Sequence, residues 1–220
     1  MPRFDCAKED ERSRGIDRAI AAASRHQLVV FPTETSYAVG CDAFSAVGVE
    51  RLNAAKGRTP IDALPVMVGS VKAARALIGT LHPQGESLIE GFWPGPLTAL
   101  CDQQSTLHWD IGGDGHHVAV RMPLHPVALE VLQGVGPMVV VAANRVGEPA
   151  PRTCGDAQSQ LDTTVSVYLD SGTLPEGPSS TVIDLTERSP RLLRPGAFDA
   201  ALLRQVAPDL IDETGDGDRS

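Results

Sequence analysis

Two cations, Lys56 and Arg58, stand one residue apart in the sequence, and two hydroxyl side chains, Thr33 and Thr35, precede them. Ammonium and guanidinium groups bind carboxylate and phosphate oxygens, and hydroxyls can donate further hydrogen bonds to such oxygens. A site that collected these four side chains would suit an anionic ligand. Each also has a simpler explanation, because a cation at the end of a helix complements the helix dipole and threonine commonly forms turns.

The elements around these residues predict that they meet. The apolar run 28–31 indicates a buried strand, and Pro32 ends it because proline has no backbone N–H. Residues 45–55 are typical of a helix with Val49 and Leu52 on one face, and the glycine that follows can end that helix. The order strand, loop, helix brings polar side chains to the edge of an open α/β sheet, which is where ligands usually bind.

Further polar residues follow later predicted strands, which strengthens the prediction of one anion site. Arg121 follows a strand at 118–120, and Asn144 follows the most hydrophobic strand, 138–143, which we expect near the centre of the sheet. Arg152 and Arg194 lie at or just after further strand ends. The remaining pattern predicts strands at 66–68, 97–100, 165–169, 180–185 and 191–194, and helices at 9–25, 70–78, 82–92, 126–133 (ended by Gly134), 156–161 and 199–206.

Composition excludes several classes of protein. The 220 residues are 42% hydrophobic, which indicates a globular chain. The net charge of −9 argues against general electrostatic binding to nucleic acid or to an anionic membrane. No apolar run approaches the length of a membrane helix, and the charged N-terminal stretch is unlike a signal peptide, so we expect a cytoplasmic protein. Four scattered cysteines and the loop histidines lack metal-ligand spacing, and we expect no metal site in the protein.

Seven segments, taken together and in order, resemble the YrdC-like family of threonylcarbamoyl-AMP synthases. They are Pro32-Thr-Glu-Thr35 with Tyr37, Lys56-Gly-Arg58, Phe92-Trp-Pro-Gly-Pro-Leu97, Val120-Arg-Met-Pro-Leu-His-Pro126, Ala143-Asn144 followed by Gly147-Glu-Pro149, Ser180-Thr-Val-Ile-Asp184, and Leu193-Arg-Pro-Gly196. The resemblance extends from residue 28 to residue 196. It implies the short, single-domain form of the family. We expect this domain to span residues 1–211, and the acidic composition of residues 212–220, with two glycines, predicts a disordered tail.

The resemblance implies an α/β (α+β) fold, an open twisted mixed sheet flanked by helices with a basic concave cleft. It also implies an enzyme that forms threonylcarbamoyl-AMP and pyrophosphate from L-threonine, bicarbonate and ATP, for the threonylcarbamoyl modification of tRNA adenosine. By position, the substrate-binding residues would be Thr35, Met67, Arg121, Ala142 and Ser180. The ATP-binding residues would be Lys56, Arg58, His117, Asn144, Arg152 and Arg194, with Lys56 and Arg58 also catalytic.

The residue types fit this chemistry. A carbamate that attacks the α-phosphate brings two anions together, and cations can offset the charge without any covalent nucleophile. Mg²⁺ is expected to arrive bound to ATP, held mainly by phosphates and water. We expect the product to pass to a tRNA threonylcarbamoyl transferase complex, and direct RNA binding to be weak.

Several positions depart from the family pattern close to the expected ligand. Ala142 replaces the usual serine two residues before the asparagine, Val146 replaces the serine that follows it, and Ala38 replaces the glycine after Tyr37. Two alternatives therefore stay open. One is a divergent paralogue that carbamoylates or adenylates another small substrate, and the other is a non-catalytic module that binds a nucleotide or RNA.

Overall fold

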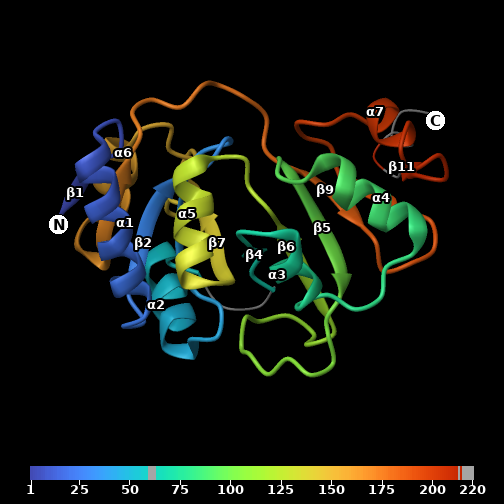
Figure 1. Ribbon diagram of the computed structural model, residues 1–220, viewed down its shortest axis with the longest axis horizontal. Coiled ribbons are helices and arrows are strands. Elements are labelled where there is room, and N and C mark those ends of the chain that lie inside the picture. Colours follow the sequence, from blue (N-terminus) through green and yellow to red (C-terminus); the bar gives the residue numbers. More distant parts are fainter. Residues whose placement is uncertain (59–62, 213, 215–220) are drawn as a thin grey trace.

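A single mixed sheet organises the computed structural model, which describes residues 1–58, 63–212 and 214 (Figure 1). Its strands are β1 (Arg3–Asp5), β2 (Leu28–Pro32), β3 (Tyr37–Asp42), β4 (Val66–Met67), β5 (Leu97–Asp102), β6 (His117–Arg121), β7 (Met138–Ala142), β8 (Val165–Asp170), β9 (Thr181–Asp184), β10 (Arg191–Arg194) and β11 (Ile211–Asp212). The helices are α1 (Glu9–Ala23), α2 (Ala46–Lys56), α3 (Val71–Arg75), α4 (Pro83–Phe92), α5 (Pro126–Val135), α6 (Cys154–Leu161) and α7 (Ala200–Arg204), with a 3₁₀ turn, η1 (Asp162–Thr164), after α6.

The strands follow the order β1-β8-β2-β3-β7-β4-β6-β5-β9-β10-β11. The sheet contains parallel pairs (such as β8 with β2, β4 with β6 and β5 with β9) and antiparallel ones (such as β2 with β3, β3 with β7 and β6 with β5). The hydrophobic strand β7 is fifth in this order, near the centre, as its composition predicts. The open mixed sheet with flanking helices confirms the fold class expected from the sequence.

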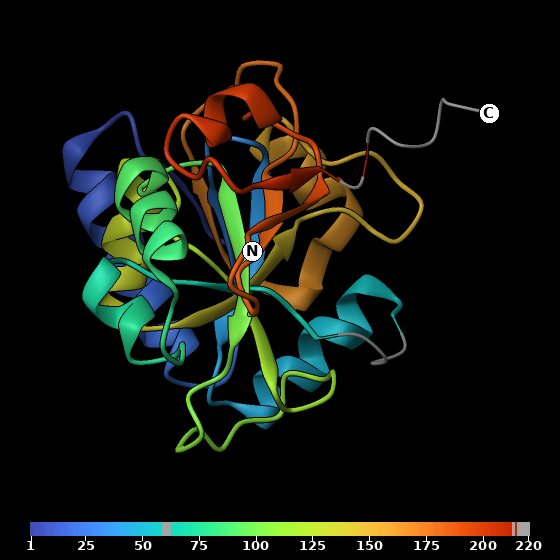
Figure 2. The ribbon, with the colours of Figure 1, turned by 90° about the vertical axis from the view of Figure 1, so that its right-hand side faces the viewer.

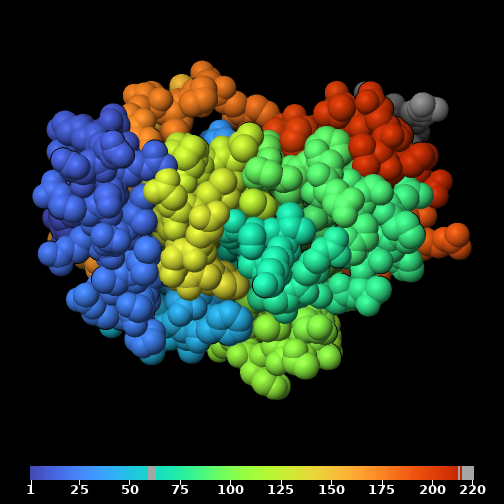
Figure 3. Space-filling view, viewed as in Figure 1, coloured from blue at the N-terminus to red at the C-terminus, as the bar shows by residue number. Residues whose placement is uncertain are grey.

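Helices cover both faces of the sheet, and β2 shows why. Successive side chains of a strand point to opposite faces, and all five residues of β2 are buried. Val29 and Phe31 belong to the apolar layer under α1 and α5, whereas Val30 belongs to the layer that contains Leu52 of α2 and Leu161 of α6. Figure 2 shows the two groups of helices on opposite sides of the strands, and in Figure 3 the surfaces of α1 and α5 adjoin.

Helix α2, which leads to Lys56, has the ends that its sequence predicts. The hydroxyl of Ser45 accepts a hydrogen bond from Gly48 N (2.9 Å), and Gly57 ends the helix in the left-handed conformation at φ 66°. The prediction that Gly134 ends α5 is wrong, because the helix continues to Val135 and Gly136 follows it at φ 96°. Gly134 instead lets Ile20 of α1 pack directly against the backbone of α5.

Strand β3 has no counterpart among the predicted elements, which pass from the strand at 28–31 to the helix at 45–55. It pairs antiparallel with β2 across the short connection 33–36, which makes the two strands a hairpin. The predicted helix 70–78 is also shorter, since α3 ends at Arg75. In the residues that the structure describes, no helix is long and apolar enough to cross a membrane. All four cysteines are buried free thiols.

The predicted tail 212–220 falls almost entirely outside the described residues, apart from Asp212 and Thr214. Asp212 is the last residue of β11, where it pairs with Leu192 of β10.

Candidate functional site

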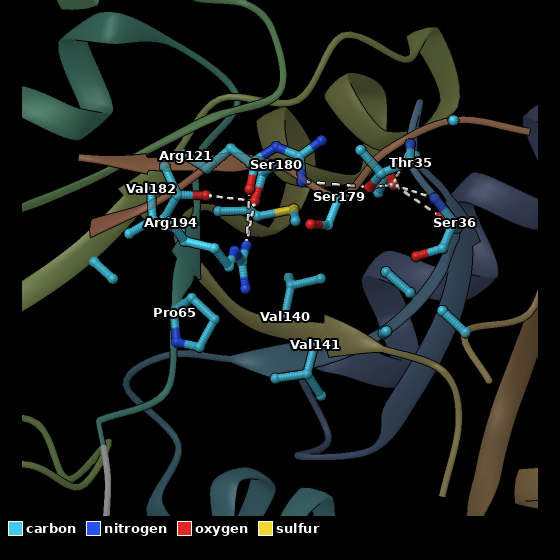
Figure 4. A pocket seen from close by; sticks show the side chains of 18 residues that line it. Thr35, Ser36, Pro65, Arg121, Val140, Val141, Ser179, Ser180, Val182 and Arg194 are labelled. Carbon is cyan, nitrogen blue, oxygen red and sulfur yellow. Dashed lines mark hydrogen bonds between the residues drawn. The ribbon is translucent and has the colours of Figure 1, made fainter. Parts of the chain in front are cut away.

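A cavity of about 480 Å³ lies on the face of the central strands that is opposite to the main core (Figure 4). Alternation along the strands explains its lining, because Val39, Val66, Val120 and Val139 belong to the main core while their chain neighbours face the cavity. The lining residues are Thr33, Thr35, Ser36, Ala38, Pro65, Met67, Thr98, Ala119, Arg121, Val140, Val141, Ala142, Ala150, Gly177, Ser179, Ser180, Val182 and Arg194. In Figure 4, Pro65, Val140 and Val141 lie below the group that contains Arg121, Ser180 and Arg194.

The connection between β2 and β3 is organised by Thr33, which is almost fully buried. Its hydroxyl donates to the carbonyl of Ser36 (2.7 Å) and accepts from the backbone N–H groups of Thr35 (3.3 Å) and Ser36 (3.2 Å). A hydroxyl that replaces backbone partners in this way fixes a tight turn. The turn holds Thr35 at the cavity wall.

Arg121, at the end of β6, is the buried cation of the cavity, with a side chain only 6% exposed. Its Nη1 donates to Thr35 Oγ1 (3.4 Å), and its Nε donates to the carbonyl of Gly95 (3.3 Å). Nη2 lies 2.7 Å from Glu34 Oε1, but the two groups are not aligned for a hydrogen bond, so this contact is an ion pair. Glu34 thus balances the charge of a guanidinium that would be costly to bury alone.

Ser180 lies beside Arg121 in Figure 4 and is held by two side chains. Thr98 Oγ1 donates to Ser180 Oγ (3.0 Å), and Arg194 Nη2 donates both to Ser180 Oγ (3.1 Å) and to the Ser180 carbonyl (2.9 Å). A Cβ on Gly196 would come within 2.6 Å of the backbone of Ser180. The glycine therefore lets the turn after β10 close onto this segment, which brings Arg194 to the cavity.

Lys56 lies at the rim, where it meets the end of β7. Its Nζ donates to the carbonyl of Ala142 (2.7 Å), to the carbonyl of Asn144, and to Asn144 Oδ1 (3.1 Å). Burial of the ammonium, and then the nearby charge of Arg58, lowers the pKa of Lys56 to about 8. The amide of Asn144 also donates to the carbonyls of Arg145 (3.0 Å) and Glu148 (2.6 Å), which shapes the loop after β7.

Of the six predicted ATP-binding residues, Arg194 lines the cavity, Lys56 and Asn144 lie at its edge, and the other three are placed elsewhere. Arg58 lines a separate surface groove with residues of α2 and with Asp110. Arg152 is exposed and donates to the carbonyl of Leu174 (3.0 and 3.2 Å). His117 begins β6, at the opposite end from Arg121, and its Nδ1 lies 2.6 Å from Asp114 Oδ2. The structure thus brings together Thr35, Met67, Arg121, Ala142, Ser180 and Arg194, with Lys56 and Asn144 at the edge.

Sequence reasoning missed several residues of the wall. Thr98 directly follows the segment 92–97, which carries part of the family resemblance, but the resemblance does not include Thr98 itself. Ser36 and Ser179 adjoin residues that were predicted, yet no spacing rule marks them as wall residues. Among the residues that the structure describes, no three His, Cys, Asp or Glu side chains gather as metal ligands.

The family comparison agrees with this geometry. The sequence model of the Sua5/YciO/YrdC family, described as "Telomere recombination", matches residues 21–196. The chain belongs to this family. A protein of Mycobacterium tuberculosis provisionally named threonylcarbamoyl-AMP synthase is 44% identical over 203 residues, a match that covers 92% of this chain and 94% of the relative. The family membership predicted from the seven segments is therefore confirmed.

Solved structures of the Sua5/YciO/YrdC family share the fold. The crystal structure of Pyrococcus abyssi Sua5 complexed with L-threonine has a TM-score of 0.84 and 33% identity, covering 90% of this chain and 58% of that one. The crystal structure of Escherichia coli YciO has a TM-score of 0.78 at 20% identity and covers 91% of this chain and 96% of its own, which shows the common fold alone. This chain thus spans little more than half of the Pyrococcus protein's length.

Proposed function

We propose that this chain is a threonylcarbamoyl-AMP synthase that acts on L-threonine, bicarbonate and ATP. The observation that carries the proposal is the cavity itself, whose wall brings together Arg121, in contact with Thr35, and Arg194, in contact with Ser180. Relatives of the family carry the name of this enzyme, and the Pyrococcus structure was solved with L-threonine. Each of these facts supports the same reaction.

In the proposed reaction, the amine of threonine combines with bicarbonate to give a carbamate and water. A carbamate oxygen then attacks the α-phosphorus of ATP, and the bond from that phosphorus to the bridging oxygen breaks to release pyrophosphate. The products are threonylcarbamoyl-AMP and pyrophosphate. Because both reactants are anionic, the principal task of the protein is to align them and to offset their charge.

We assign the threonine carboxylate to the corner formed by Arg121 and Thr35. The guanidinium is buried, so its attraction for an anion is screened less than it would be in water. Arg194 and Lys56 add positive charge on two further sides, and phosphates are their natural partners. In the described structure, the three N–H donors of Lys56 bond to protein oxygens. We therefore propose that Lys56 acts on ATP through its positive charge and by holding the end of β7 in place.

Mg²⁺ would enter with ATP as its companion ion. Among the described residues, the cavity wall contains cations and hydroxyls and no carboxylate, which fits an ion held by phosphates and water better than one held by a protein cage. The mixed anhydride product reacts readily with nucleophiles, and we propose that a tRNA threonylcarbamoyl transferase receives it in the cytoplasm.

Pyrophosphate release from ATP and bicarbonate tests this function when it is measured across a panel of amino acids. We expect release that depends on L-threonine and on bicarbonate, and that is at least a hundredfold slower in Arg121→Ala, since that variant loses a buried charged contact of about 3 kcal/mol. Arg145→Ala removes an exposed arginine outside the cavity wall and serves as the control. Release without dependence on any amino acid would contradict the proposal.

A second candidate is the same chemistry on another small amino acid or amine. The observation that favours it is the apolar wall at Val141 and Ala142, where the family resemblance implies a proline and a serine. The same panel decides between the two, because a paralogue would release pyrophosphate faster with serine, valine or 2-aminobutyrate than with threonine.

A further inference from the structure

The hydroxyl of Ser180 lies between two donors that the chain itself supplies. Thr98 Oγ1 donates to Ser180 Oγ over 3.0 Å, and Arg194 Nη2 donates to the same atom over 3.1 Å. A serine hydroxyl offers two lone pairs that accept and one hydrogen that donates. Both lone pairs are therefore used, and the hydrogen is what Ser180 can offer to a ligand.

We propose that Thr98 is a positioning residue that fixes Ser180 as a hydrogen-bond donor to an anionic oxygen of the ligand. Ser180 and Thr98 both line the cavity, so a bound molecule reaches the hydroxyl directly. Without Thr98, the hydroxyl of Ser180 would have a free lone pair and could rotate to accept from a ligand. With Thr98 in place, both lone pairs of Ser180 Oγ are used, so the hydroxyl can only donate to a ligand.

The sheet explains why Thr98 keeps this role. Strands β5 and β9 are parallel, with Leu97 opposite Thr181 and Thr98 opposite Val182, and Thr181 N donates to the carbonyl of Pro96 (2.9 Å). This register places the Thr98 side chain beside the residue that precedes β9. Thr98 is only 8% exposed, so its hydroxyl has no ready partner in bulk water. Its bond to Ser180 satisfies a donor that would otherwise be buried unpaired.

Charge selects the kind of ligand atom that Ser180 meets. Arg194 contacts Ser180 directly, and Arg121 lies at the same corner of the cavity. An ammonium group would meet two cations and no available lone pair, whereas a carboxylate or phosphate oxygen accepts the hydroxyl hydrogen and is attracted by both guanidinium groups. This inference rests on the proposed function, which supplies both kinds of oxygen, in L-threonine and in ATP.

Thr98→Val tests the proposal because it keeps the shape of the side chain and removes only its hydroxyl. Calorimetric titration of the variant with L-threonine and, separately, with ATP should show one affinity lowered by about 3- to 10-fold, the range expected for one hydrogen bond. A loss for L-threonine identifies the carboxylate as the acceptor, and a loss for ATP identifies a phosphate. Thr98→Ser keeps the hydroxyl and should bind both ligands as the wild type does.

Two further variants separate positioning from general damage to the fold. Thr181→Val makes the same change at a buried threonine of the adjacent strand, whose hydroxyl bonds to Phe198 and not to the cavity. It should lower the melting temperature and leave both affinities unchanged. In a Ser180→Ala background, Thr98→Val should cause no further loss of affinity, because the group that Thr98 positions is already gone.

Each of the following outcomes would overturn the inference. Unchanged affinity of Thr98→Val for both ligands shows that Ser180 needs no positioning, and an equal further loss in the Ser180→Ala background shows that Thr98 acts by another route. Wild-type protein that binds neither L-threonine nor ATP overturns the proposed function and this inference together. Normal wild-type binding and pyrophosphate release with an unaffected Thr98→Val overturns the inference alone.

Discussion

Lys56 is the residue whose surroundings say most about its chemistry. Its ammonium contacts the carbonyls of Ala142 and Asn144 and the side-chain oxygen of Asn144, and it is half-buried. Burial, and then the charge of Arg58, lowers its pKa from 10.5 to about 8. The positive charge at the rim of the cavity can therefore be lost within an accessible range of pH.

We expect ATP affinity to fall as the pH rises through about 8. If only the charged form of Lys56 attracts the triphosphate, the apparent Kd should increase about tenfold between pH 7 and pH 9. Calorimetric titrations at constant ionic strength measure this change. Lys56→Arg is the matched variant, since guanidinium stays charged throughout, and its profile should be flat over the same range. An identical pH profile in wild type and Lys56→Arg would show that another group titrates.

The same pKa shift has the opposite effect on folding. The folded state binds fewer protons than the unfolded state between about pH 8 and pH 10.5, because only the folded environment lowers the pKa of Lys56. Its contribution to the free energy of unfolding should therefore increase with pH over that window. Chemical denaturation of wild type and Lys56→Arg separates this effect from the loss of ATP affinity.

The sequence predicts the types of these residues better than their bonds. Lys56, Arg121, Ser180 and Arg194 could be chosen because cations and hydroxyls near strand ends suit an anion. That Lys56 is anchored on backbone carbonyls of β7, or that Glu34 balances Arg121, depends on contacts between distant parts of the chain. For His117, the family resemblance gives only a position in the sequence. Its contact with Asp114, from the loop that precedes β6, could not be predicted from that position.

The segment 171–179 is the element that depends most on one side chain. The hydroxyl of Tyr37, in β3, donates to the carbonyl of Gly172 (2.6 Å) and accepts from Ser171 N (2.9 Å), and it also lies 3.1 Å from Asp170 Oδ1. These contacts anchor the start of the segment. Its far end carries Gly177 and Ser179 to the cavity wall and leads directly to Ser180.

Tyr37→Phe should loosen this segment and weaken ligand binding. The change leaves Ser171 N and the Gly172 carbonyl without their partner, which should cost about 1 to 3 kcal/mol of stability. Hydrogen exchange should become faster at residues 171–180, and affinity for L-threonine should fall severalfold because Ser180 is held less firmly. Mass-spectrometric exchange and calorimetry measure the two effects.

Tyr168→Phe provides the matched control for this prediction. Tyr168 is also fully buried, on strand β8, and its hydroxyl donates to the carbonyl of Asp162 (2.9 Å), a residue outside the segment 171–179. The control should lower the melting temperature and leave exchange at 171–180 unchanged. Equal exchange at 171–180 in both variants would show that the segment does not depend on Tyr37.

At this scale the sequence predicts elements with a clear period and misses those that packing defines. The helix before Lys56 and the strand 138–143 are readily found from their apolar pattern and caps. Strand β3 is hidden by Gly40, whose lack of a side chain allows the carbonyl of Val139 to approach to within 2.8 Å of a would-be Cβ. Similarly, only the contact with Ile20 explains why Gly134 lies inside α5.

The whole molecule combines a net charge of −9 with a small basic corner. Arg121 is buried and paired with Glu34, and Arg194 is committed to Ser180, so these cations serve the cavity and not an outer face. A polynucleotide needs many accessible cations along its backbone, whereas ATP needs only a few at one place. The charge distribution therefore favours a small anion over direct binding of tRNA.

We expect tRNA to bind at least a hundredfold more weakly than ATP at physiological ionic strength. Fluorescence anisotropy of labelled tRNA, from about 50 to 200 mM salt, measures both the affinity and its salt dependence. The logarithm of the affinity constant falls by about 0.9 per log unit of salt for each duplex phosphate that the protein neutralises. ATP titrated through the same series serves as the control and should show the slope of a few contacts. Tight binding of tRNA, with a salt dependence that corresponds to several phosphate contacts, would require a basic surface outside the cavity. That result would favour the alternative of a nucleotide- or RNA-binding module over an enzyme. Arg194→Ala then separates the two alternatives, because it should weaken ATP binding in the cavity while leaving binding at an outer surface intact.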